Sequence, residues 1–192
     1  MTDDLLLKLA RVIGLLGLGL LVFSGVGGVL LASRTAQRMK LFKGKTYKYH
    51  RMTSLVGAGL FLLHPIPMLF AHRTTGMNMT NIFVPFTAPK QTLLIALGTL
   101  AAYTLTIVTV SSLYIKKIRR GTWRILHYGT YLALALGLVH GLLISGEFKV
   151  GETFEFEEPE KILLLILAGI TILFPIGRII AAKRSRPKVA AI

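Results

Sequence analysis

Five long apolar segments constrain this chain of 192 residues more than any other feature of its sequence. Each is long enough to cross about 30 Å of hydrocarbon, which takes roughly 20 residues of helix. A soluble domain of this length would not carry so much continuous apolar sequence. We therefore predict an all-α transmembrane bundle of five helices that forms a single domain over residues 1–192. The predicted helices cover approximately residues 10–33, 51–72, 91–115, 125–145 and 161–182.

The charges predict an orientation for this bundle. The formal net charge is +15, and basic residues gather within 34–51, 116–124 and 178–188. If the helices alternate in direction, all three clusters lie on one side, which the positive-inside rule makes cytoplasmic. The N-terminus is then outside and the C-terminus is cytoplasmic. Because the cations lie between apolar segments and are not interleaved with aromatic side chains, we expect no nucleic-acid partner.

Four of the five histidines form two pairs at matched depths in the predicted bundle. His50 and His64 are 14 residues apart on the second helix, and His127 and His140 are 13 residues apart on the fourth. At about 1.5 Å per residue these spacings are roughly 21 Å and 20 Å along the helix axes. Both helices run in the same direction, so His50 lies level with His127 (the inner pair) and His64 with His140 (the outer pair).

Paired imidazoles at two levels are typical of haem ligation. A six-coordinate haem takes one axial ligand on each face, and neutral imidazole is a strong one. The chain has no cysteine, which excludes thiolate-bound iron–sulfur clusters and covalently attached c-type haem. We therefore predict two haem b irons, each with one paired histidine on either side. Gly57, midway between His50 and His64, is predicted to leave room for a ring.

The spacings raise two geometric questions. Fourteen residues return an ideal helix to within about 40° of its starting face, whereas 13 leave it about 140° away. The two rings on the fourth helix are therefore offset around it, or that helix is deformed. On the second helix, Pro65 and Pro67 directly follow His64 and each removes a backbone hydrogen bond, so we predict a kink there.

Haem propionates are anionic and need cationic or hydroxyl partners. At the inner pair we expect these to be Arg51 and Arg124, and at the outer pair His72 and Arg73. Phe61 is a candidate for the space between the two haems.

The fourth helix contains Trp123-Arg124-Ile125-Leu126-His127, followed by Tyr131 and His140. This segment resembles the W-x-x-L-H-x-x-x-Y…H signature of the ferric reductase-like transmembrane family. That family includes the membrane domains of NADPH oxidases and ferric reductases, and the haem subunit of the bacterial methionine sulfoxide reductase system. The resemblance covers roughly residues 47–145. It implies a cytochrome b-like domain in which the inner pair ligates one haem and the outer pair the other.

By this resemblance we expect an electron-transfer subunit of an oxidoreductase in a bacterial inner (plasma) membrane, with lipid around it. No flavin or nicotinamide domain follows Ile192, so we expect a separate redox partner protein or membrane complex as electron donor. We expect no catalytic residue on the chain itself, and whether it is an enzyme stays open. Two alternatives also stay open: a quinol-oxidising cytochrome b subunit, which would bind quinone, and a haem-free structural subunit of a larger complex.

Overall fold

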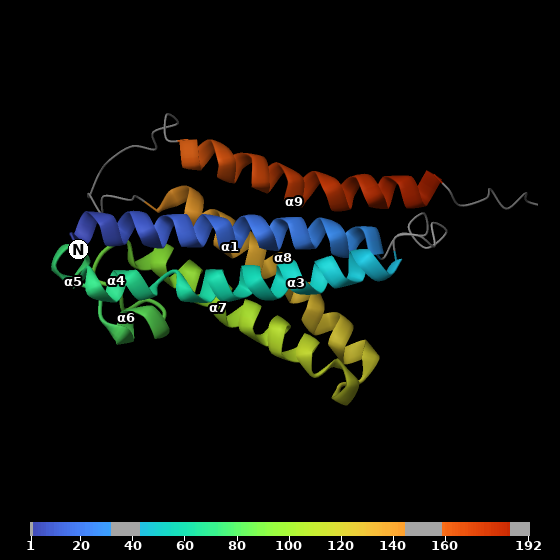
Figure 1. Ribbon diagram of the computed structural model, residues 1–192, viewed down its shortest axis with the longest axis horizontal. Helices are drawn as coiled ribbons and strands as arrows, with labels where there is room; N and C mark the ends of the chain where they lie inside the picture. Colours follow the sequence, from blue (N-terminus) through green and yellow to red (C-terminus); the bar gives the residue numbers. More distant parts are fainter. Residues whose placement is uncertain (1, 32–42, 145–158, 185–192) are drawn as a thin grey trace, which may run out of the picture.

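The computed structural model describes residues 2–31, 43–144 and 159–184, and these residues form helices and connections without strands. Within them, five helices are long and apolar enough to cross a membrane, which confirms the predicted helical bundle (Figure 1). The helices are α1 (Asp3–Leu31), α3 (Lys43–Leu63), α4 (Ile66–Phe70), α5 (His72–Thr75), α6 (Met79–Phe83), α7 (Thr92–Leu113), η2 (Ile115–Lys117), α8 (Arg120–Leu143) and α9 (Pro159–Arg184).

Three helices begin earlier than hydropathy predicted. α1 begins at Asp3 instead of residue 10, α3 at Lys43 instead of residue 51, and α8 at Arg120 instead of residue 125. Hydropathy marks only the part of a helix that crosses hydrocarbon, whereas backbone hydrogen bonds continue the helix into the polar interface. α7 and α9 begin and end within two residues of their predicted bounds.

The long helices alternate in direction along the chain. The beginnings of α3 and α8 and the end of α9, which carry the basic clusters, lie at one end of the bundle (Figure 1). The N-terminus and the short helices α4, α5 and α6 lie at the opposite end. Which end faces the cytoplasm stays a prediction.

Pro65 interrupts the second membrane segment, as predicted. α3 ends at Leu63 and α4 resumes at Ile66. Proline has no N–H, so Pro65 cannot donate to the carbonyl of Phe61 four residues earlier in the helix. The break therefore falls at His64, one of the two outer-pair residues.

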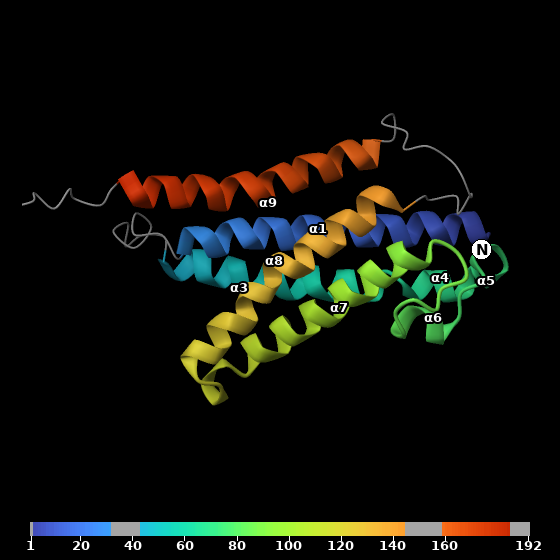
Figure 2. The same ribbon diagram turned by 180° about the vertical axis from the view of Figure 1, so that it is seen from behind.

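α1 packs closely along α3, and α7 packs closely along α8. Glycines allow the first contact: a Cβ on Gly17 of α1 would lie only 2.7 Å from the backbone nitrogen of Phe61 in α3. A core of buried side chains, among them Leu18, Phe61 and Leu134, joins the two helix pairs. α9 covers one side of the bundle, against α1 and α8 (Figures 1 and 2).

The path of α8 answers the question raised by the 13-residue spacing. α8 is an unbroken helix from Arg120 to Leu143, and it runs obliquely across α1 and α3 (Figure 2). An oblique helix turns different faces toward its neighbour at its two ends. His127 and His140 can therefore leave α8 on different faces and still both meet α3, with no deformation of the helix.

Candidate cofactor site at two histidine pairs

The structure brings together the histidines that were paired by depth. The imidazole centroids of His50 and His127 are 6.2 Å apart with their planes at 77°. Those of His64 and His140 are also 6.2 Å apart, with their planes at 63°. The described residues contain no group of three or more His, Cys, Asp or Glu side chains that could hold a metal ion by itself. Each pair thus offers two protein ligands, which is what an iron already held by a macrocycle requires.

The distance between the paired rings can be compared with two arrangements, a shared metal and a direct hydrogen bond. A bond from a metal to an imidazole nitrogen is about 2 Å long, and each ring nitrogen lies about 1 Å from its centroid. Two imidazoles on one iron therefore have centroids about 6 Å apart. A direct hydrogen bond of about 3 Å between ring nitrogens would reduce this to about 5 Å. The 6.2 Å in both pairs matches the first arrangement.

The orientation of His64 follows from the proline beside it. The Nδ1 atom of His64 donates a hydrogen bond to the carbonyl oxygen of Phe61. In an unbroken helix that carbonyl would accept from the N–H of residue 65, which is Pro65 and has none. The imidazole of His64 therefore supplies the hydrogen bond that the backbone nitrogen of Pro65 cannot donate to this carbonyl.

Two other histidines use carbonyl oxygens on a neighbouring helix, each four residues before a glycine. His140 Nδ1 lies 2.7 Å from the oxygen of Leu94 in α7, and a Cβ on Gly98 would lie 2.9 Å from the ring of His140. His50 Nδ1 lies 2.8 Å from the oxygen of Ser24 in α1. A Cβ on Gly28 would lie 3.1 Å from the ring of His50. The absent side chains give both imidazoles access to the helix backbone.

His127 has different neighbours. Its Nδ1 lies 3.3 Å from the hydroxyl oxygen of Ser112 in α7. The indole of Trp123, one helical turn earlier, stacks on its ring with centroids 4.9 Å apart and planes at 22°. The indole Nε1 of Trp123 is buried and finds no acceptor among the described residues. A buried donor of this kind calls for an acceptor beyond the described residues.

These contacts assign the nitrogen that is available to a metal. A carbonyl oxygen only accepts, so the protons of His50, His64 and His140 lie on Nδ1. Nε2 then carries the lone pair, and it forms no hydrogen bond with the described residues. Histidines that bind metals generally donate their other ring nitrogen to a carbonyl, a carboxylate or water, and this fixes both tautomer and ring orientation.

A cavity opens at the outer pair. His64 and His140 line it, and so do small residues such as Gly14, where a Cβ would lie 3.3 Å from the ring of His64. The wall is mostly apolar, with three charged residues from α1 and α9. These are Arg11, Glu160 and Lys161.

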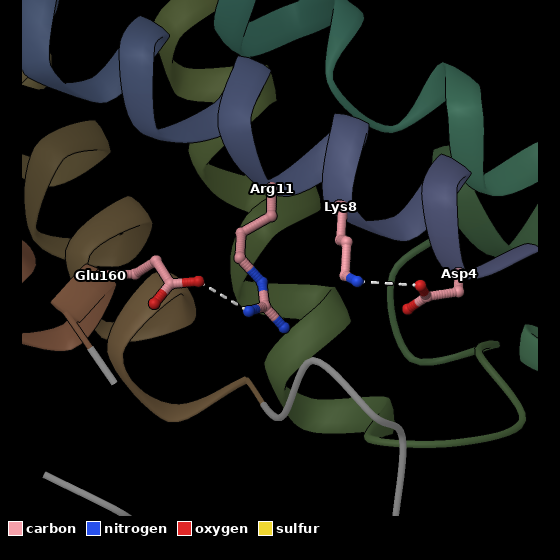
Figure 3. A network of polar contacts seen from close by, with 4 residues as sticks. All are labelled: Asp4, Lys8, Arg11 and Glu160. Atoms are coloured by element: carbon pink, nitrogen blue, oxygen red, sulfur yellow. Dashed lines mark hydrogen bonds and ion pairs between the residues drawn. The ribbon is translucent and has the colours of Figure 1, made fainter. Parts of the chain in front are cut away.

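The charged wall was not found from the sequence. Arg11 donates to the carboxylate of Glu160 across 2.8 Å, although the two residues are 149 positions apart in the chain. Asp4 and Lys8 form a second ion pair at 2.9 Å, one turn earlier in α1 (Figure 3). The sequence does not give the neighbours of α9 in the bundle, so it offered no signal for these contacts.

The remaining predicted residues have other surroundings. Arg51, Arg73 and Arg124 are exposed. The side chain of His72 lies outside what the structure describes. Gly57 faces α1, where a Cβ would lie 3.0 Å from the oxygen of Gly17, so the contact that the structure gives it is one between helices.

Fold and site together define a multi-pass integral membrane protein with two imidazole pairs whose ring centroids are 6.2 Å apart. The model of the family described as ferric reductase like transmembrane component matches residues 12–149, a range that includes both pairs. The chain belongs to this family, which confirms the resemblance seen in the fourth helix. Its members are membrane domains that bind haem and transfer electrons, in a lipid environment and with a redox partner. No curated protein and no solved structure matches the chain.

Proposed function

We propose that the chain is a di-haem b cytochrome that passes electrons across the bilayer between a partner protein on one side and an acceptor on the other. The observation that carries this proposal is the equal separation of 6.2 Å in both imidazole pairs. His50 and His127 would hold one iron, and His64 and His140 the other. Each bound haem supplies a one-electron iron couple, and the chain holds, orients and encloses it.

The space between the two levels is lined by buried apolar side chains and contains an aromatic ring. Phe61 is 4% exposed, and its ring centroid lies 5.3 Å from that of His64. Phe61 lines the outer cavity and also a smaller apolar cavity nearer the inner pair. Buried leucines such as Leu18 and Leu134 surround it. We therefore assign Phe61 to the path between the haems, where apolar packing excludes water.

The inner pair has a donor for the anionic edge of a haem. The buried Nε1 of Trp123 lacks an acceptor among the described residues, and the indole stacks on His127. A propionate carboxylate is the acceptor that a haem at this level would supply. Arg51 and Arg124, both exposed, would contact a propionate only where it reaches the surface of the bundle.

The two alternatives receive less support. In a haem-free structural subunit, histidines facing each other across helices would be expected at hydrogen-bonding distance, and these rings are too far apart. A quinol-oxidising subunit needs a quinone site next to a haem, and no feature of the described residues favours quinone over the haem itself.

Electron transfer across a bilayer tests this function. The purified protein is reconstituted into liposomes that contain ferricyanide, and dithionite is added outside. We expect ferricyanide reduction at a rate well above that of empty liposomes. His50→Leu and His64→Leu, which each remove one haem, should abolish the difference, whereas Gly19→Ala, whose added Cβ would meet nothing within 4 Å, should preserve it. A wild-type protein that contains both haems but does no better than empty liposomes would refute the proposal.

A further inference from the structure

The connection between α5 and α7, residues 76–91, does not stay at the end of the bundle. The hydroxyl of Thr99 donates a hydrogen bond of 3.0 Å to the carbonyl oxygen of Ile82, and the hydroxyl of Tyr103 donates to that of Phe83. Thr99 lies seven residues after the start of α7, which is roughly 10 Å along that helix at about 1.5 Å per residue. The end of α6 therefore lies beside the first half of α7 (Figures 1 and 2).

The outer pair gives a depth for this point. His140 contacts α7 at the carbonyl oxygen of Leu94, whereas Ile82 is bonded to Thr99, five residues further along the same helix. The 22 residues of α7 measure roughly 33 Å, just enough to cross about 30 Å of hydrocarbon. Because α7 has no residues to spare, its first turns cannot extend far into water. Ile82 and Phe83 are therefore at a depth where lipid chains surround the bundle.

The polar groups near this point find partners within the connection. Asn78 and Asn81 each accept a hydrogen bond from the backbone N–H of the other. Asn81 is only 8% exposed, and its amide also donates to the carbonyl oxygen of Thr87 at 2.7 Å, which joins the two arms of the connection. The hydroxyl of Thr87 donates to the carbonyl oxygen of Val84 at 2.8 Å. Backbone at membrane depth needs such partners, because hydrocarbon supplies none.

One side of the connection is buried against the bundle. Met77 and Ala88, one from each arm, are 3% and 5% exposed, and they form a small core with Ala10 of α1 and Ile95 of α7. Ile82 packs against the same core. Both arms are thus held against the spanning helices by apolar contacts, in addition to the hydrogen bonds from α7.

The other side of the connection is apolar and exposed. Met79, Phe83 and Phe86 are 61%, 58% and 62% exposed. Residues 76–89 include no charged side chain. Exposed apolar patches mark surfaces that a membrane or a protein partner covers, and the depth along α7 favours the membrane.

We propose that residues 76–91 form a re-entrant segment, which enters the membrane and leaves it on the same side, and that Phe83 and its exposed neighbours contact lipid acyl chains. The inference goes beyond the proposed function and does not require haem. Hydropathy did not reveal the segment because its apolar run is far shorter than the roughly 20 residues that a spanning helix needs.

A nitroxide label at residue 83 tests this proposal. The chain contains no cysteine, so Phe83→Cys can be labelled at a single position in the otherwise intact protein and reconstituted into phosphatidylcholine liposomes. Power-saturation electron paramagnetic resonance measures collisions of the label with oxygen, which concentrates in hydrocarbon, and with a water-soluble nickel chelate. Ile107→Cys, at a position of α7 that is 54% exposed, is the hydrocarbon reference. Lys116→Cys, at an exposed position between α7 and α8, is the aqueous reference.

We expect the ratio of oxygen to nickel collisions at residue 83 to equal that at residue 107 and to exceed that at residue 116 several-fold. A ratio as low as that at residue 116 would place the segment in water and overturn the proposal. Low collision rates with both reagents would also overturn it, because protein, such as a second copy of the chain, would then cover the side chain. If Phe83→Cys does not accumulate, Val84→Cys, at a position 46% exposed, is measured against the same references.

Discussion

The Nδ1 atom of His64 is hydrogen-bonded to the carbonyl oxygen of Phe61, the acceptor that Pro65 leaves without a backbone donor. One proline thus accounts for the helix break, for an available carbonyl and for the tautomer of the neighbouring histidine. Gly98 and Gly28 have a related effect at His140 and His50, because a missing side chain exposes a carbonyl four residues earlier. Three imidazoles are therefore oriented by backbone oxygens of helices.

Replacing the proline should weaken the outer haem site. Pro65→Ala supplies the N–H that the oxygen of Phe61 lacks, so the backbone would compete with His64 for it. We expect the affinity for the outer haem to fall roughly 10- to 100-fold, the effect typical of removing the hydrogen-bond partner of a metal ligand. Haem transfer to a haem-free globin measures the loss. Pro67→Ala is the control in the same segment, and an equal loss there would contradict the role assigned to Pro65.

A methyl group at Gly98 should displace His140. The added Cβ would lie 2.9 Å from both Cε1 and Nδ1 of the imidazole. Alanine favours a helix over glycine by about 1 kcal/mol, so any loss cannot be ascribed to a weaker α7. We expect Gly98→Ala to retain the inner haem and to lose most of the outer one, as measured by haem content per chain. Gly19→Ala, whose Cβ would meet nothing within 4 Å, should keep both haems.

The inner pair should respond unequally to the loss of its two serine hydroxyls. His127 Nδ1 has the hydroxyl of Ser112 at 3.3 Å, whereas His50 Nδ1 has both the hydroxyl and the carbonyl of Ser24, at 2.9 Å and 2.8 Å. Ser112→Ala should therefore lower the affinity for the inner haem roughly 10-fold or more. Ser24→Ala, which keeps the carbonyl, should change it little. The reverse order in the globin transfer assay would contradict the assigned orientations.

Trp123→Phe tests the unpaired indole nitrogen at the inner pair. The substitution keeps an aromatic ring beside His127 and removes the buried donor. Without that donor a propionate keeps more of its negative charge, so the potential of the inner haem should become more negative while that of the outer haem stays the same. Arg124→Gln, at the exposed neighbour, should produce a smaller shift. Identical potentials in wild type and Trp123→Phe, measured by spectroelectrochemical titration, would rule out the contact.

The bundle and the two histidine pairs could be predicted because both depend on position along single helices. Hydropathy gives the membrane-crossing segments, and the rise per residue turns the spacings of His50 to His64 and of His127 to His140 into depths. The carbonyl bonded by His64 could also have been inferred, since Phe61 is four residues before Pro65. The beginnings of the helices could not, because their polar first turns carry no apolar signal.

Contacts between helices could not be predicted from the sequence. Ser24 and His50 are 26 residues apart, and Leu94 and His140 are 46 apart, so these bonds depend on which helices are neighbours. The sequence alone does not give the order of the helices in the bundle, so it cannot show that glycines in α1 and α7 face imidazoles. The sequence therefore suggested partners of the outer haem only among residues close to His64, and it did not indicate that α9 lies beside the outer pair.

The haem content of the purified protein and its ligand variants tests the central claim most directly. Pyridine haemochrome spectra, combined with protein quantification, give the number of haem b groups per chain. We predict two for wild type, one for His50→Leu, one for His64→Leu, and none when both are replaced. A wild-type protein without haem, or single variants that still bind two, would contradict the arrangement of one haem between the members of each pair.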